Sequence, residues 1–138
     1  MNGIDPVGLN LFSSRVSAIC EEMGLVLKRA SFSPNIKDRL DYSCAIFDTK
    51  GEMLAQADHM PVHLGSMAYA MHSIVRDQDW NQGDILVLND PFLGGTHLPD
   101  VTVISPVFLD GNHLGGFVVN RAHHALSLIH ISEPTRPY

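Results

Sequence analysis

The sequence predicts an α+β fold, in which a long N-terminal helix, a β-hairpin and a second helix accompany a mixed or antiparallel sheet. Apolar residues recur every three or four positions over the first thirty residues, which is the period of an amphipathic helix. Later in the chain, short apolar runs alternate with glycine-containing turns, which is typical of strands. With 138 residues, the chain has room for one modest domain.

The first predicted helix begins at Asp5 and Pro6. The Asp5 carboxylate can cap free backbone N–H groups, and a proline at the first helical position loses no hydrogen bond. We expect the helix to end before Pro34, because the residue that precedes a proline is pushed out of the helical region. The predicted apolar face consists of Leu9, Phe12, Val16, Ile19, Cys20, Met23, Val26, Leu27 and Ala30.

A β-hairpin and a second helix are predicted next. Residues 42–48 and 51–57 are two short strand-like runs around a turn that contains Gly51. Ser66 can cap a helix that continues to Asp77. The side chains expected to face inward from this helix are Met67, Ala70, Met71, Ile74 and Val75.

Three further strands are predicted at residues 84–89, 101–108 and 114–120. The first is an almost uninterrupted apolar run, which indicates a strand with both faces covered. The other two flank a turn at residues 110–112. The order of helix, hairpin, helix and three strands supports the α+β prediction.

The composition excludes several classes of protein. The formal net charge is −6 and no Lys/Arg cluster occurs, which argues against binding to a nucleic-acid backbone. No apolar run approaches the roughly 18–20 residues of a membrane helix, and we expect no signal peptide. The two cysteines, Cys20 and Cys44, are predicted to be small buried residues of a reduced, cytoplasmic protein.

The last thirteen positions, residues 126–138, differ in character from the rest. They resemble a translated sequencing-adapter or vector scar, and such a segment is left out of fold reasoning. The alternative is a native C-terminal tail. We expect a non-native tail and therefore assign no function to His130.

A candidate metal site is formed by residues that follow or connect the predicted strands. His97 and Asp100 lie three positions apart, and Pro99 stiffens the turn between them. A third ligand, His123 or His124, comes at the end of the last strand. Two imidazoles and one carboxylate suit divalent Mn, Fe or Zn and leave coordination positions open. The alternative is a set of surface or hydrogen-bonded loop histidines.

His63 lies in an apolar stretch, so it is either a buried histidine bonded to a backbone carbonyl or a ligand or catalytic residue. Asp58 and His59 directly follow the predicted strand at residues 51–57. If that strand continues through them, their side chains point to opposite faces and cannot both belong to one site. The chain has no glycine-lysine phosphate loop, no dinucleotide fingerprint and no nucleophile elbow. Any phosphate-handling machinery must therefore belong to another domain or chain.

Several motifs together resemble the hydantoinase B/oxoprolinase family. They are Asp5-Pro6, SPNI at 33–36, DYSCAIF at 41–47, HMPVHLGSM at 59–67, NDPFLGGTHLPD at 89–100 and RAHH at 121–124. The similarity is colinear from about Asp5 to Ala125, so residues 1–125 are interpreted as the N-terminal part of a larger, truncated domain of this family. The family includes the N-methylhydantoinase B subunit, the C-terminal part of 5-oxoprolinase and the acetone carboxylase alpha subunit.

The resemblance implies a metal site and a base. In the carboxylase relatives the metal is held by residues that match His97, Asp100 and His123, with His124 as the alternative for the third position. By their place in the motif, His63 or Asp58 would act as the general base.

The resemblance also implies a partner and a reaction. A hydantoinase A-type subunit would bind ATP and phosphorylate a cyclic amide, such as a hydantoin or 5-oxoproline, and metal-activated water would open the ring. One alternative is the alpha subunit of an ATP-dependent acetone or ketone carboxylase. An alternative of another class is an inactive assembly fragment, and we expect little or no activity from the 138 residues alone.

Overall fold

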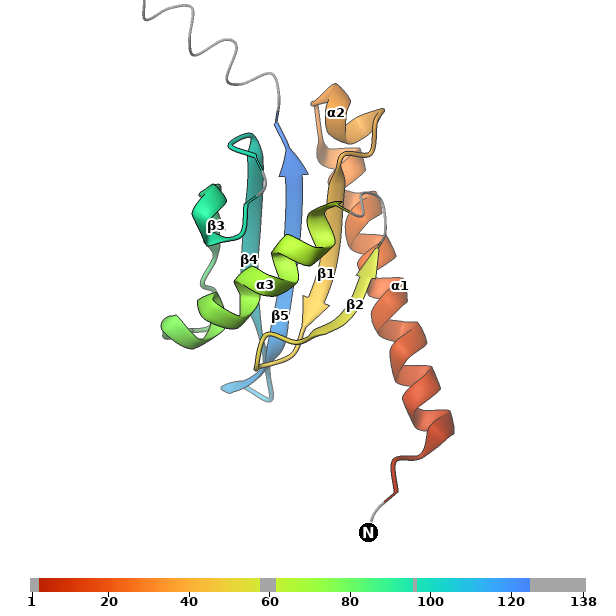
Figure 1. Cartoon of the computed structure of the whole chain (residues 1–138). Coiled ribbons are helices and arrows are strands. Elements are labelled where there is room, and N and C mark those ends of the chain that lie inside the picture. The colour runs from red at the N-terminus through yellow and green to blue at the C-terminus, as the bar shows by residue number, and fades with distance from the viewer. Residues whose placement is uncertain (1–2, 58–61, 96, 125–138) are drawn as a thin grey trace, which may run out of the picture.

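The computed structural model describes residues 3–57, 62–95 and 97–124. Figure 1 shows a single sheet with helices packed on it. No helix of the described part is long and apolar enough to cross a membrane. The elements are the helices α1 (Pro6–Ala30), α2 (Pro34–Lys37) and α3 (Val62–Asp77), the 3-10 helix η1 (Pro91–Leu93) and the strands β1 (Tyr42–Phe47), β2 (Met53–Ala57), β3 (Leu86–Leu88), β4 (Asp100–Leu109) and β5 (His113–His123).

The sheet has five strands in the order β2-β1-β5-β4-β3, and every neighbouring pair is antiparallel. The α+β prediction is confirmed, and of its two options the sheet is the antiparallel one. The predicted hairpin is β1–β2, and the turn at residues 110–112 joins β4 and β5 into a second, longer hairpin.

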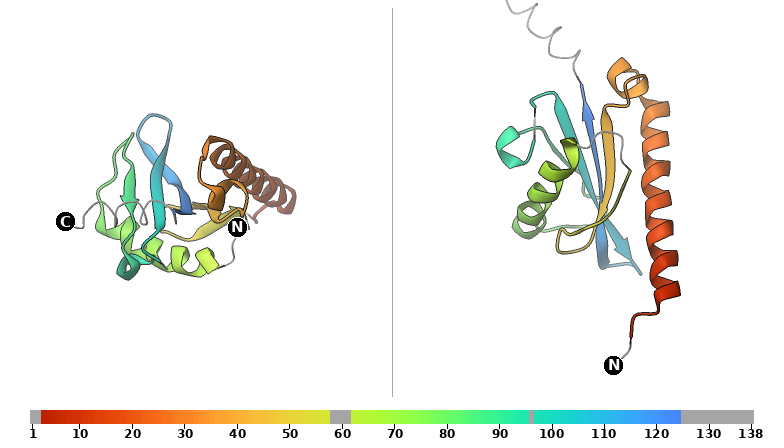
Figure 2. Two further views of the ribbon diagram at one scale, coloured as in Figure 1. Left: turned by 90° about the horizontal axis from the view of Figure 1, so that it is seen from above. Right: turned by 45° about the vertical axis from the view of Figure 1, so that its right-hand side comes forward.

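The two long helices lie on opposite faces of the sheet, as the turned view in Figure 2 shows. On the α3 side, Ala45, Phe47, Phe117 and Val119 of the strands pack with helix residues such as Met67 in one buried cluster. On the α1 side, alternate residues of the same strands pack with Val16, Cys20 and the short α2 in a second cluster. Successive strand residues point to opposite faces of the sheet, so the hydrophobic core is divided into two clusters, one on each face.

The start of α1 is the predicted one. Asp5 accepts hydrogen bonds from the backbone N–H groups of Val7 and Gly8, at 3.2 Å each, and Pro6 is the first helical residue. The predicted apolar face is only partly buried, because the helix packs on β1 and β2 and its N-terminal half runs beyond them (Figure 1). The members of that face that remain exposed are Leu9, Phe12, Ile19, Val26 and Ala30.

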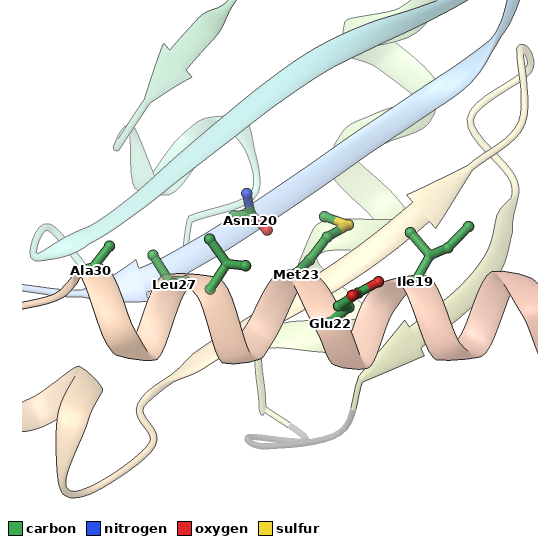
Figure 3. Close-up of a pocket in the computed structure, with 7 residues that line it drawn as sticks. Ile19, Glu22, Met23, Leu27, Ala30 and Asn120 are labelled. Carbon is green, nitrogen blue, oxygen red and sulfur yellow. The ribbon is translucent and has the colours of Figure 1, made fainter.

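A groove of about 430 Å³ lies between α1 and β5. Figure 3 shows Met23 and Leu27 of α1 beside it, with Asn120 of β5 on the opposite wall.

The prediction that both cysteines are buried is confirmed. Cys20 and Cys44 have no exposed surface, and burial raises their thiol pKa values to about 11 and about 12. These thiols therefore pack as small apolar groups.

Two boundaries near the candidate site differ from the sequence prediction. Helix α3 begins at Val62, so Ser66 is not a cap but an inner residue, whose hydroxyl donates to the carbonyl oxygen of His63 at 3.2 Å. Strand β5 continues three residues beyond Asn120 to His123, because β1 and β4 pair with it on both sides.

The prediction that residues 84–89 form a strand covered on both faces is wrong. Strand β3 has three residues and lies at the edge of the sheet, where Ile85 and Val87 are 66% and 59% exposed. An apolar run indicates that burial of its side chains is favourable. It does not indicate which other elements of the fold lie close enough to cover them.

Candidate metal centre

The β4–β5 hairpin brings a carboxylate and an imidazole together. Asp100 is the first residue of β4 and His123 the last of β5, and the two are direct cross-strand partners. Partners in an antiparallel pair project from the same face of the sheet. The Nδ1 atom of His123 lies 2.7 Å from Oδ1 of Asp100, a short hydrogen bond to a carboxylate that is fully buried.

His97 reaches the same carboxylate from the loop that precedes β4. Its backbone N–H donates to Oδ2 of Asp100 at 3.2 Å, and its carbonyl accepts from the Asp100 backbone N–H at 2.9 Å. This tight turn puts Nδ1 of His97 at 3.6 Å from Oδ2 of Asp100. The two imidazole rings face each other edge to face, with centroids 6.0 Å apart.

His97, Asp100 and His123 therefore form the predicted group. Each offers one ligand atom, and these atoms lie within 4.8 Å of one another. Exposure increases from Asp100 at 0% through His123 at 22% to His97 at 62%, so the group opens to solvent on the His97 side. His124 is not in the group; its backbone N–H donates to the Pro99 carbonyl instead.

The donor set fits a divalent metal ion of borderline character. Two neutral imidazole nitrogens and one carboxylate oxygen are ligands that Mn, Fe and Zn accept, and three protein ligands leave positions open for water or substrate.

His63 is buried beside this group at the start of α3, with 2% of its surface exposed. Its Nδ1 atom lies 3.2 Å from the Ser43 hydroxyl, and its Nε2 atom lies 3.5 Å from Oδ1 of Asp41. Sequence reasoning did not connect these three residues, because they come from a loop, a strand and a helix. The other base candidate, Asp58, lies outside the described residues.

Arg121 is the residue that sequence reasoning missed. It is fully buried on the α3 side of β5 and donates hydrogen bonds to Thr102, Ser66 and the carbonyl oxygen of Gly94. The sequence could have predicted its burial from the two-residue period of a strand. Arg121 lies two residues from Val119 and four from Phe117, so it shares the inward face of these apolar residues.

The burial of His63 predicts a pH dependence of stability. Burial lowers the pKa of His63 below its ordinary value of 6.5, more than Asp100 and Asp41 raise it. The unfolded chain therefore takes up this proton at a higher pH than the folded chain does. We expect the free energy of unfolding to decrease as the pH falls below about 6.5, and His63→Gln to weaken that dependence.

Urea denaturation of the metal-free protein between pH 5 and 8 measures this effect. The control is His113→Gln, which removes an exposed imidazole at the start of β5. If the two variants changed the pH dependence equally, the burial of His63 would not be its source.

The sequence of this chain is similar to a short part of several longer proteins. The sequence model of the family described as Hydantoinase B/oxoprolinase matches residues 5–125. The 5-oxoprolinase of Saccharomyces cerevisiae is 48% identical over 124 residues, which cover 88% of this chain and 10% of that protein. The chain thus spans about a tenth of the length of this relative.

Two solved structures share the fold. The ATP-dependent caprolactamase of Pseudomonas jessenii superimposes with a TM-score of 0.78 at 32% identity, over 88% of this chain and 21% of that one. A nucleotide-free acetone carboxylase superimposes with a TM-score of 0.77 at 23% identity, over 86% of this chain and 16% of that one.

Proposed function

Because the chain belongs to the hydantoinase B/oxoprolinase family, we propose that it supplies the metal-binding part of an ATP-dependent enzyme that opens cyclic amides. The observation that carries this proposal is the convergence of His97, Asp100 and His123 on one point at the end of the β4–β5 hairpin. The two relatives named for hydrolysis support the substrate class, since 5-oxoproline and caprolactam are both lactams.

In this proposal His97, Asp100 and His123 hold a divalent Mn, Fe or Zn ion. When bound, such an ion supplies Lewis-acid chemistry and lowers the pKa of a water ligand towards about 7. The chain's own residues orient the site: Asp100 accepts hydrogen bonds from His123 Nδ1 and from the His97 backbone. The exposed side of His97 leaves room for the substrate to approach.

We further propose His63 as the group that accepts a proton from the attacking water, with Asp58 as the alternative. Because burial lowers its pKa, the His63 imidazole is neutral at physiological pH and able to accept a proton. Asp41, at 3.5 Å from Nε2, would stabilise the imidazolium that forms. Since His63 is almost fully buried, the proton would travel through its hydrogen-bonded neighbour Ser43 or through the nearby Asp41 carboxylate.

A partner subunit or domain would bind and use the ATP. The sequence has no phosphate-binding loop, so a hydantoinase A-type subunit or domain is proposed to transfer the γ-phosphoryl group of ATP to the amide carbonyl oxygen. Water then adds to the carbonyl carbon and the C–N bond breaks, which gives the free amine and an acyl phosphate. A second water hydrolyses the acyl phosphate to the carboxylate and inorganic phosphate.

An assay of the full-length protein with its A-type partner tests this function. We expect ADP formation coupled to ring opening with 5-oxoproline, a hydantoin or caprolactam. Incorporation of labelled bicarbonate into a ketone, without lactam hydrolysis, would instead identify a ketone carboxylase. ATP-dependent turnover by the 138 residues alone would contradict the requirement for a partner.

A further inference from the structure

We infer that Arg121 is a positioning residue, which holds the loop of His97 in register with the strands of Asp100 and His123. This inference rests on the proposed metal site. Arg121 does not belong to the ligand group, but it lies two residues before His123 on β5 and is the cross-strand partner of Thr102 on β4.

The guanidinium joins β5 to three other parts of the fold: β4, the loop at Gly94 and α3. Its Nε atom donates to Thr102 Oγ1 of β4 at 2.8 Å, and its Nη2 atom donates to the Gly94 carbonyl at 2.8 Å. Its Nη1 atom donates to Ser66 Oγ of α3 at 2.6 Å and, at 3.5 Å, to the carbonyl oxygen of His63. Because these donors point in fixed directions from one planar group, the partners cannot shift independently.

The Gly94 contact matters most for the metal site, because His97 follows only three residues later. Gly94 has a φ of +92°, and a Cβ atom there would collide with the Cβ atom of Ala70 on α3. The next residue, Gly95, donates its N–H to the Asp90 carbonyl at 3.2 Å. The loop is thus pressed against α3 on one side and bonded to Arg121 on the other.

The charge of Arg121 is also part of the arrangement. The hydrogen bonds described above all end on neutral oxygens, while burial lowers the pKa of Arg121 and the nearby Asp100 opposes that shift. Arg121 and Asp100 are therefore two buried, mutually compensating charges at diagonal positions of the same hairpin, since Asp100 pairs with His123 and Arg121 with Thr102. Lysine would keep the charge but could not reproduce the forked set of donors.

The test is Arg121→Lys in the full-length protein, with Co²⁺ as the metal probe. We expect the affinity for Co²⁺, measured by competition with a chelator, to fall about tenfold to a hundredfold. The visible absorption spectrum of bound Co²⁺ should change, because the geometry of the His97 ligand is altered. The matched control is Val119→Ala, which removes a buried side chain from the same face of β5. It should lower stability and leave the Co²⁺ spectrum unchanged.

An unchanged affinity and spectrum in Arg121→Lys would overturn the inference. If that variant does not fold, Ser66→Ala decides: it removes the 2.6 Å partner but keeps the buried charge, and a spectrum identical to that of the unsubstituted protein would likewise overturn it. Failure of the unsubstituted protein to bind Co²⁺ would instead contradict the metal site itself, so the two failures are distinguishable.

Discussion

Asp100→Asn should abolish stoichiometric metal binding by the full-length protein and lower its ATP-dependent turnover by more than about a hundredfold. Asparagine keeps the shape of the side chain but removes the negative charge that lies between His97 and His123. Asp100 is fully buried, so no solvent-exposed carboxylate can take its place without movement of the hairpin. His97→Ala should likewise leave the purified protein without bound metal.

Elemental analysis of the purified variants measures the metal directly. The matched control is Asp90→Asn, the same substitution ten residues earlier, where the carboxylate caps η1 by accepting from the Phe92 N–H at 2.8 Å. Asparagine also caps helices well, so this variant should retain its metal. An unchanged metal content in both Asp100→Asn and His97→Ala would refute the assignment of the ligands.

Gly94→Ala should destabilise the protein far more than Gly83→Ala. Both glycines have a φ near +90°, so each substitution costs about 1–2 kcal/mol for the left-handed backbone. A Cβ atom at Gly83 meets nothing within 4 Å, whereas at Gly94 it collides with Ala70 and lies 3.0 Å from the Ser66 carbonyl oxygen. Overpacking of this kind adds about 1–3 kcal/mol at Gly94.

Urea denaturation of both variants gives the two free energies of unfolding. The difference between them isolates the contact between the loop and α3, because the backbone cost is common to both. Equal losses would show that the loop does not pack on α3. Metal binding should also weaken in Gly94→Ala only, since His97 belongs to the loop that is displaced.

The local elements could be predicted from residues that are close in sequence. Asp5 and Pro6 start α1 because a cap and its N–H partners lie within three residues. The hairpins follow from Gly51 and Gly111, which adopt φ values of +84° and +85° in their turns. The start of α3 at Val62 was not predicted, because serine favours the capping position and Ser66 was therefore expected to begin the helix. In the structure the Ser66 hydroxyl bonds to His63 and Arg121 and caps no helix.

Sequence alone determined which residues are chemically able to form the site: two histidines and an aspartate near a stiff turn and a strand end. Only the tertiary structure decided that His123 rather than His124 joins His97 and Asp100, and that Arg121 is buried beside them. It also decided that β3 is a partly exposed edge. The physical reason is that turns and caps depend on neighbouring residues, whereas the face that a strand residue presents depends on its pairing register with distant strands.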